Sequence, residues 1–183
     1  ANYLAGATMG TLVEGGLGSS YTGANLTIAG VTGLAASAAT SGTNLVLGIG
    51  NDYVGGTLAS LTNSDGLSSS YAVYVASGGN LGGLTNTSTL SGSTAAIHNE
   101  GVLGAIVNSG VIAGNIENLS AQALSISGGT LTGFAAGSQG RITNLRGDVV
   151  FSGNLTLNDA VNVGSNTVVN KDSTLSLINS VNV

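Results

Sequence analysis

An internal repeat constrains the fold of this chain more than any other feature of its sequence. Residues 97–103 and 106–112 share the pattern apolar-x-Asn-x-Gly-Val-apolar, and the second copy begins nine residues after the first (106 − 97). Residues 61–67 and 84–90 fit a looser form, and three later segments carry its first half. Such self-similarity is typical of architectures in which each repeat buries its apolar face against the next.

The asparagines of this pattern set the period of the repeat. Asn86 and Asn108 are spaced by 22 (108 − 86), Asn99 and Asn118 by 19 (118 − 99), and the last three members by 26 (144 − 118, 170 − 144). We therefore predict coils of roughly 20 to 26 residues, with the tight pair at 97–112 as two sides of one coil. Stacked amide side chains can bond the next coil, which predicts a structural turn and ladder role for these residues: Asn63, Asn86, Asn99, Asn108, Asn118, Asn144 and Asn170.

Short runs between these asparagines alternate between apolar and polar residues. Examples are residues 124–126, 155–157, 161–163 and 175–177. A period of two predicts short strands with one buried and one exposed face, and the Gly, Asn, Ser and Asp residues between the runs predict turns. Residues 34–39 form the only helix-like run, and a small-residue corner is as good an interpretation as a single turn of helix.

The fold class follows from comparing two all-β alternatives. An antiparallel sandwich also has many short strands, but it uses hairpin dipeptides such as Asn-Gly and Asp-Gly, of which Asp65-Gly66 is the only example. Aromatic residues make up only 4% of the chain, which suits a narrow interior filled by rows of aliphatic side chains. We predict an all-β chain, a parallel β-helix (β-solenoid) forming a single domain over residues 1–183. Residues 1–60 would form less regular coils or a cap, and residues 61–183 regular coils.

Charge and cysteine content exclude several functions. Charged residues make up 6% of the chain, the net charge is −5, and Lys and Arg together number three. A nucleic-acid partner is not expected, because it requires a basic patch. The chain has no cysteine and one histidine, so neither disulfides nor a His- or Cys-based metal site is expected. No apolar run reaches the roughly 18 residues of a membrane-spanning helix.

A few residues have side chains capable of chemistry, but structural or solvent roles are favoured for them. His98 is expected on an outward coil position, without a catalytic partner. Glu100 and Glu117 lie in nearby coils and can approach each other, although solvated acids are the favoured interpretation. Tyr71 and Tyr74 are expected to point to opposite faces of a strand, with partial burial. Four Asn-x-Ser/Thr sequences are candidate glycosylation sites: Asn25, Asn86, Asn118 and Asn154.

The segment 96–114 resembles the repeats of bacterial autotransporter (type V secretion) passenger domains, which read roughly Ile-x-Asn-x-Gly-x-Ile-x-Gly. Residues 147–183 look like the passenger sequence shortly before the membrane barrel of that family, and the resemblance covers residues 84–183. It implies a right-handed parallel β-helix, and export through a C-terminal outer-membrane barrel that this chain lacks. It also implies display on the cell surface, with adhesion or self-association as the common role.

The function expected on these grounds is that of a secreted structural or adhesive β-helix on the bacterial surface, active in aggregation or biofilm formation. Its partners would be a second copy of itself, or glycans and proteins of the host or matrix. No catalytic, cofactor-binding or metal-binding residue is expected. The alternatives are a subunit of a self-assembling extracellular filament and a glycan-active β-helix enzyme. An ice-binding solenoid is disfavoured because it needs a regular Thr-x-Thr face.

Overall fold

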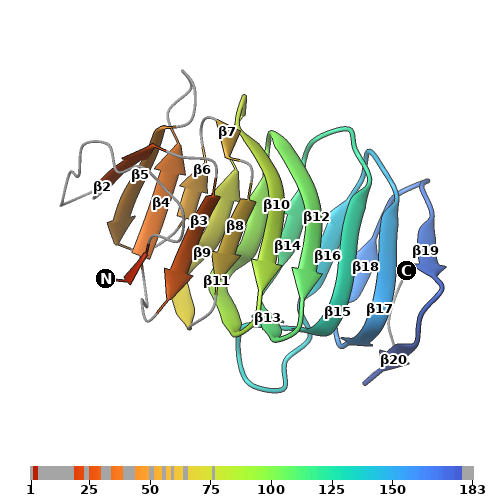
Figure 1. The fold of residues 1–183 in the computed structure, drawn as a ribbon. Coiled ribbons are helices and arrows are strands. Elements are labelled where there is room, and N and C mark those ends of the chain that lie inside the picture. The colour runs from red at the N-terminus through yellow and green to blue at the C-terminus, as the bar shows by residue number, and fades with distance from the viewer. Residues whose placement is uncertain are drawn as a thin grey trace.

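A computed structural model describes residues 2–3, 19–22, 25–29, 34–38, 44–49, 52–54, 57–58, 60–63, 66–75 and 77–178. Its described residues form strands and no helix, and the strands stack as a parallel β-solenoid of about five turns (Figure 1). The predicted all-β, solenoid class is therefore confirmed. No helix within the described residues is long and apolar enough to cross a membrane.

Each coil has three sides, which we call faces A, B and C, and each face is a row of parallel strands from successive coils. Face A contains β8 (Ser60–Asn63), β10 (Asn80–Asn86), β12 (Val102–Asn108), the first halves of β15 (Leu124–Thr132) and β17 (Val149–Leu157), and β19 (Val168–Lys171).

Face B contains the first halves of β9 (Leu67–Val75) and β11 (Thr89–Asn99), β13 (Val111–Ala113), the second halves of β15 and β17, and β20 (Leu175–Leu177). Face C contains β6 (Asp52–Val54), the second halves of β9 and β11, β14 (Ile116–Asn118), β16 (Arg141–Asn144) and β18 (Ala160–Asn162).

The strands nearer the N-terminus pair differently. β3 (Asn25–Ala29) and β7 (Thr57–Leu58) continue the parallel stack onto β8 and β10, and β1 (Asn2–Tyr3) pairs antiparallel with β3. β2 (Ser19–Thr22), β5 (Asn44–Ile49) and β4 (Leu34–Ala38) form a separate antiparallel sheet. The helix-like run at residues 34–39 is thus a strand over Leu34–Ala38, because pairing with β5 overrides the local preference of its alanines. The division at residue 60 stays a prediction.

The core consists of aliphatic rows that run along the solenoid. Each inward side chain stacks on the one at the same position of the next coil, as the alternation predicts. Fully burying a Val, Leu, Ile or Phe side chain stabilises a fold by about 1.5–3 kcal/mol. Representative rows are Leu84–Ile106–Ile126–Phe151 on face A, Leu90–Ile112–Leu131–Leu157 on face B and Ile97–Ile116–Ile142–Val161 on face C.

Candidate functional site

The asparagines singled out by the repeat lie mainly at two corners of the coil. At the end of face A, Asn63 Nδ2 donates to Asn86 Oδ1 at 2.9 Å, and Asn86 Nδ2 donates to Asn108 Oδ1 at 2.9 Å. All three side chains are at most 3% exposed. Each amide also bonds the backbone of its own turn or the next; Asn86 Nδ2, for example, reaches Ser88 O at 3.0 Å. The three residues form the first ladder.

A second ladder runs along the end of face C. Asn99 Nδ2 donates to Asn118 Oδ1 at 2.7 Å, and Asn118 Nδ2 donates to Asn144 Oδ1 at 3.1 Å. Asn144 Nδ2 finishes the ladder on the carbonyls of Gln122 and Asp148, each at 2.9 Å. Apart from Asn63 Oδ1, the ladders give their buried amide groups the hydrogen bonds that buried polar groups require.

Asn170 does not join either ladder. It is exposed and lies in β19 opposite Phe151, and within the described residues its side chain bonds only to Ser173, in its own turn. The prediction that Asn170 continues the ladder from Asn144 was wrong. It assumed that the spacing of 26 residues between Asn118 and Asn144 repeats, but the next coil is shorter. Residue 116 pairs with residue 142, but residue 142 pairs with residue 161.

The first ladder ends at Asn108 for a steric reason. The next coil turns this corner with Gly128 and Gly129, whose φ angles are +75° and +66°. A Cβ on Gly129 would overlap the Asn108 amide, so no side chain can continue the ladder there. At its other end Asn63 Oδ1 is buried and has no hydrogen-bond partner among the residues that the structure describes.

Two of the four candidate glycosylation sites are excluded because their asparagines belong to the ladders. Asn86 is 0% exposed and Asn118 is 2% exposed, and both amides are hydrogen-bonded, so neither can carry a glycan in the folded protein. Asn154 is exposed. Asn25 has no described side chain.

A cluster of aromatic and acidic side chains lies on the outward side of face C. Tyr74, His98 and Glu117 occupy one row of paired positions on β9, β11 and β14. His98 Nδ1 lies 2.6 Å from Glu117 Oε2, and His98 Nε2 lies 3.0 Å from Glu100 Oε1. The Tyr74 hydroxyl donates to Glu100 Oε1 at 2.8 Å. Three coils are therefore joined by one polar network.

The rings of the cluster contact one another. Tyr74 stacks on His98 with centroids 4.6 Å apart, and Tyr71 meets Tyr74 edge-on at 5.3 Å. The two tyrosines thus lie together, and the expectation that they point to opposite faces was wrong. Ala72 and Val73, the two residues between the tyrosines, are both buried, so the strict alternation of buried and outward side chains is broken in this part of β9.

The cluster is built around a buried imidazole, that of His98, which contacts two carboxylates. His98 lies in the outward row, as expected, but it is only 8% exposed because its neighbours cover it. Hydrogen bonds from His98 and then from Tyr74 hold the pKa of Glu100 below its ordinary value. Glu100 and Glu117 do approach each other, as considered from the sequence, but through a shared imidazole. With both carboxylates on His98, the cluster is arranged to cross-link coils.

One buried acid does not stand out in the sequence. Asp159 is 0% exposed; its Oδ1 accepts from Gly140 N at 3.0 Å, and its Oδ2 has no partner. Burial raises the pKa of this carboxyl to about 7, and the Gly140 hydrogen bond opposes the rise only partly. Asp159 sits at a corner of the last full coil, after the buried strand end at Leu157. Nothing in the alternation pattern distinguishes it from the exposed turn acids.

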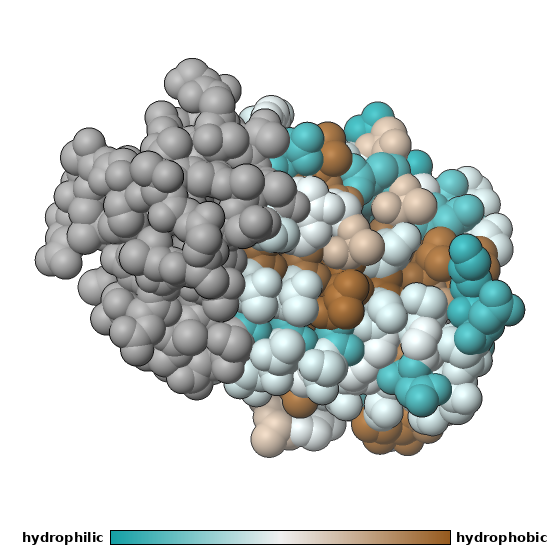
Figure 2. All heavy atoms as spheres, viewed as in Figure 1, coloured by the Kyte–Doolittle hydropathy of each residue, from teal (hydrophilic) through white to brown (hydrophobic). Residues whose placement is uncertain are grey.

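The outward rows of faces A and B carry hydroxyl and β-branched side chains. On face B the row is Thr89, Val111, Thr130, Thr156 and Ser176. On face A it is Thr85, Val107, Ser127, Ser152 and then Lys171. Val102 and Val107 on β12 are about half exposed, at 50% and 49%. Figure 2 shows the side that carries β10, β12, β15 and β17, where pale residues of intermediate hydropathy predominate and both brown hydrophobic and teal hydrophilic residues lie among them.

Within the described ranges no group of three His, Cys, Asp or Glu residues is placed to hold a metal ion. Comparison with models of protein families found no match, and comparisons with curated proteins and with solved structures found none either.

Proposed function

We propose that this chain is a non-catalytic adhesive module of the autotransporter-passenger type, displayed outside the cell, that associates side to side with a second copy of itself. The observation that supports this proposal is the pair of adjacent faces A and B. In their outward rows only Lys171, at the end of face A, carries a charge.

Such rows suit weak contact between identical surfaces. Like charges meeting across an interface oppose association, and face B has none in its outward row. Serine and threonine hydroxyls both donate and accept, so identical rows can bond each other without a complementary partner. Half-exposed Val102 and Val107 supply apolar area on face A.

The size of the faces sets the expected strength. About five coils at a spacing of about 4.8 Å give a face on the order of 25 Å long. Two such faces bury an area at or below the lower end of stable protein interfaces, so the association should be weak and readily reversible. Adhesion by such a module would depend on many copies acting together.

Sedimentation equilibrium over a concentration series tests the proposal. The wild-type chain should show a weight-average mass that rises reversibly with concentration. Thr130→Lys places a charge in the middle of face B and should weaken association by about tenfold or more, since an unpaired charge must be desolvated.

Thr143→Lys is the matched control. It makes the same change of residue and net charge on the outward row of face C, and Thr143 is half-buried like Thr130. A strict monomer at the highest concentration contradicts the proposal, and so does equal weakening by both variants. Electron microscopy of the same samples would show filaments if copies stack end to end instead.

A further inference from the structure

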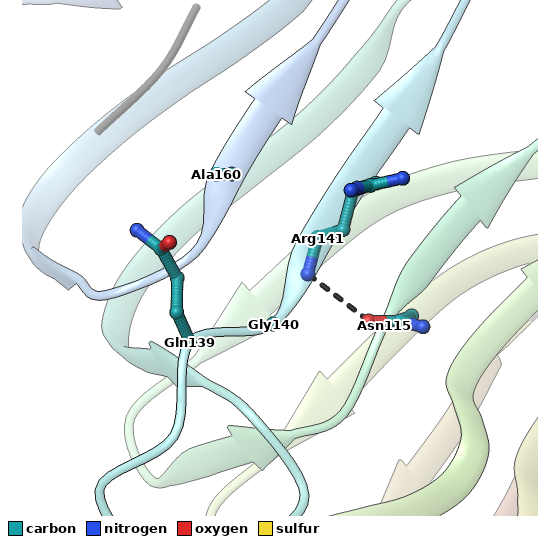
Figure 3. A pocket seen from close by; sticks show the side chains of 5 residues that line it. All are labelled: Asn115, Gln139, Gly140, Arg141 and Ala160. Carbon is teal, nitrogen blue, oxygen red and sulfur yellow. Dashed lines mark hydrogen bonds between the residues drawn. The ribbon is translucent and has the colours of Figure 1, made fainter.

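A polar hollow lies at the corner between faces B and C. It encloses about 260 Å³ and is lined by Asn115, Gln139, Gly140, Arg141 and Ala160 (Figure 3). These residues come from three successive coils: the turn before β14, the turn leading into β16, and the first residue of β18. The volume is slightly below the range of pockets for drug-sized ligands, so it suits one small polar unit.

Hydrogen bonds fix two parts of the hollow: Gly140, which forms its floor, and the Asn115 side chain, which forms one wall. Asn115 Oδ1 accepts from Arg141 N at 3.0 Å, and its Nδ2 donates to Thr94 O at 3.3 Å, so the amide is held at both ends. Gly140 N donates to Asp159 Oδ1 at 3.0 Å, and Gly140 O accepts from Ala160 N at 2.9 Å. The hollow is therefore formed before any ligand arrives, which lowers the entropic cost of binding.

Only glycine fits the floor. A Cβ on Gly140 would lie 2.5 Å from Asp159 Oδ1, closer than real contacts allow. The side chains of Gln139 and Arg141, two residues apart, extend from either side of this glycine, with Ala160 beside them (Figure 3). The buried Asp159 carboxyl thus holds a bare backbone position between two exposed polar side chains.

The chemistry of the lining identifies a class of ligand. The only charged side chain in it is the exposed Arg141, which makes no ion pair with any residue in the described part of the chain. A guanidinium matches a carboxylate as a planar, two-pronged partner. The amides of Asn115 and Gln139 offer both donors and acceptors, as hydroxyl groups require. The lining contains no aromatic or large aliphatic side chain that would select an apolar group.

We propose that this hollow binds the carboxylate-bearing sugar unit of an acidic polysaccharide, with Arg141 on the carboxylate and the amides of Asn115 and Gln139 on ring hydroxyls. This is a second activity, at the corner where face B meets face C, and none of the residues that line the hollow belongs to the outward rows of the contact surface proposed above. It does not depend on self-association, and the two proposals can fail separately.

Isothermal titration of the full chain with oligogalacturonate tests the inference, with the methyl-esterified oligosaccharide as the neutral counterpart. The wild-type chain should bind the acid form and not the ester. Arg141→Gln should weaken binding by about tenfold or more, as expected for loss of a charge-assisted contact. Arg141→Lys keeps the positive charge but not the two-pronged geometry of the guanidinium, so its affinity should lie between those of the wild type and Arg141→Gln.

Arg146→Gln is the control, because this substitution removes the same charge from another exposed arginine. Arg146 lies outside the hollow, where its guanidinium donates to Leu119 O. It should bind like wild type. Equal binding of acid and ester, equal loss in both arginine variants, or no binding of the acid form by a folded wild-type chain would each overturn the proposal. Since both arginines are exposed, circular dichroism should show unchanged folding in every variant.

Discussion

Replacing Asp159 by asparagine should stabilise this protein, by an amount that depends on pH. The Asp159 carboxyl is 0% exposed and its Oδ2 has no hydrogen-bond partner. Asparagine has the same shape, keeps an oxygen for Gly140 N, and carries no charge, so it mimics the protonated acid. The variant therefore isolates the cost of burying the charge.

The sign follows from the direction of the pKa change. Burial raises the pKa of Asp159 from an ordinary 3.8 to about 7, so between these values the folded state binds more protons than the unfolded state. Stability from this group is fully present below the unfolded value, falls as pH rises through this window, and levels off above about pH 7. The full difference corresponds to about 4 kcal/mol at alkaline pH.

Urea unfolding of both chains at several pH values measures the effect. The stability advantage of Asp159→Asn should grow by about 2.5 kcal/mol between about pH 5 and about pH 8. Asp172→Asn is the matched control, because it makes the same change of residue at an exposed turn position. An advantage that is the same at both pH values, or a variant less stable than wild type at the higher pH, would refute the reasoning.

Two further substitutions, each paired with a control, test the corners of the coil. Asn86→Leu should lower the free energy of unfolding by about 2–4 kcal/mol, because it removes a hydrogen bond from a buried amide on each neighbouring coil and places an apolar group among polar atoms. Asn170→Leu at an exposed position should change the free energy of unfolding by less than about 0.5 kcal/mol, and urea unfolding compares the two variants. Gly128→Ala should cost more than Gly78→Ala in the same assay. Both glycines have positive φ, +75° and +83°, and share a backbone penalty of about 1–2 kcal/mol, but only the Cβ at 128 would press on the Asn108 carbonyl, at 2.5 Å. Equal losses for the two glycine variants would show that the ladder corner is not tightly packed.

The repeat carries enough information to predict most of the solenoid. Residues 97–103 and 106–112 span two consecutive corners, from face C to face A and from face A to face B. The two shorter spacings join Asn86 to Asn108 and Asn99 to Asn118. These relations can be found in the sequence because stacking places identical side chains on one another, so the period of the amides is the length of the coil. The alternation between them predicts which side chains fill the interior.

The candidate sites were less predictable, because they depend on loops that the repeat does not control. The turn at residues 133–140 makes one coil longer, so that residue 116 on face C pairs with residue 142. The next coil is shorter, and residue 142 pairs with residue 161. That change of coil length leaves Asn170 outside the ladder. It also brings Gln139 and Arg141 beside Ala160 and places Gly140 over Asp159.

The sequence by itself determined the class of fold, the inward aliphatic rows and the low charge of the outward faces, because these depend on residue type and local period. Only the tertiary structure decided which side chains meet across coils. The stacking of Tyr74 on His98, the contact of His98 with Glu117 and the hydrogen bond from Gly140 to Asp159 all depend on the register between neighbouring coils. Register is set by loop length and by shifts within strands, and one residue of slip moves every side chain to the opposite face.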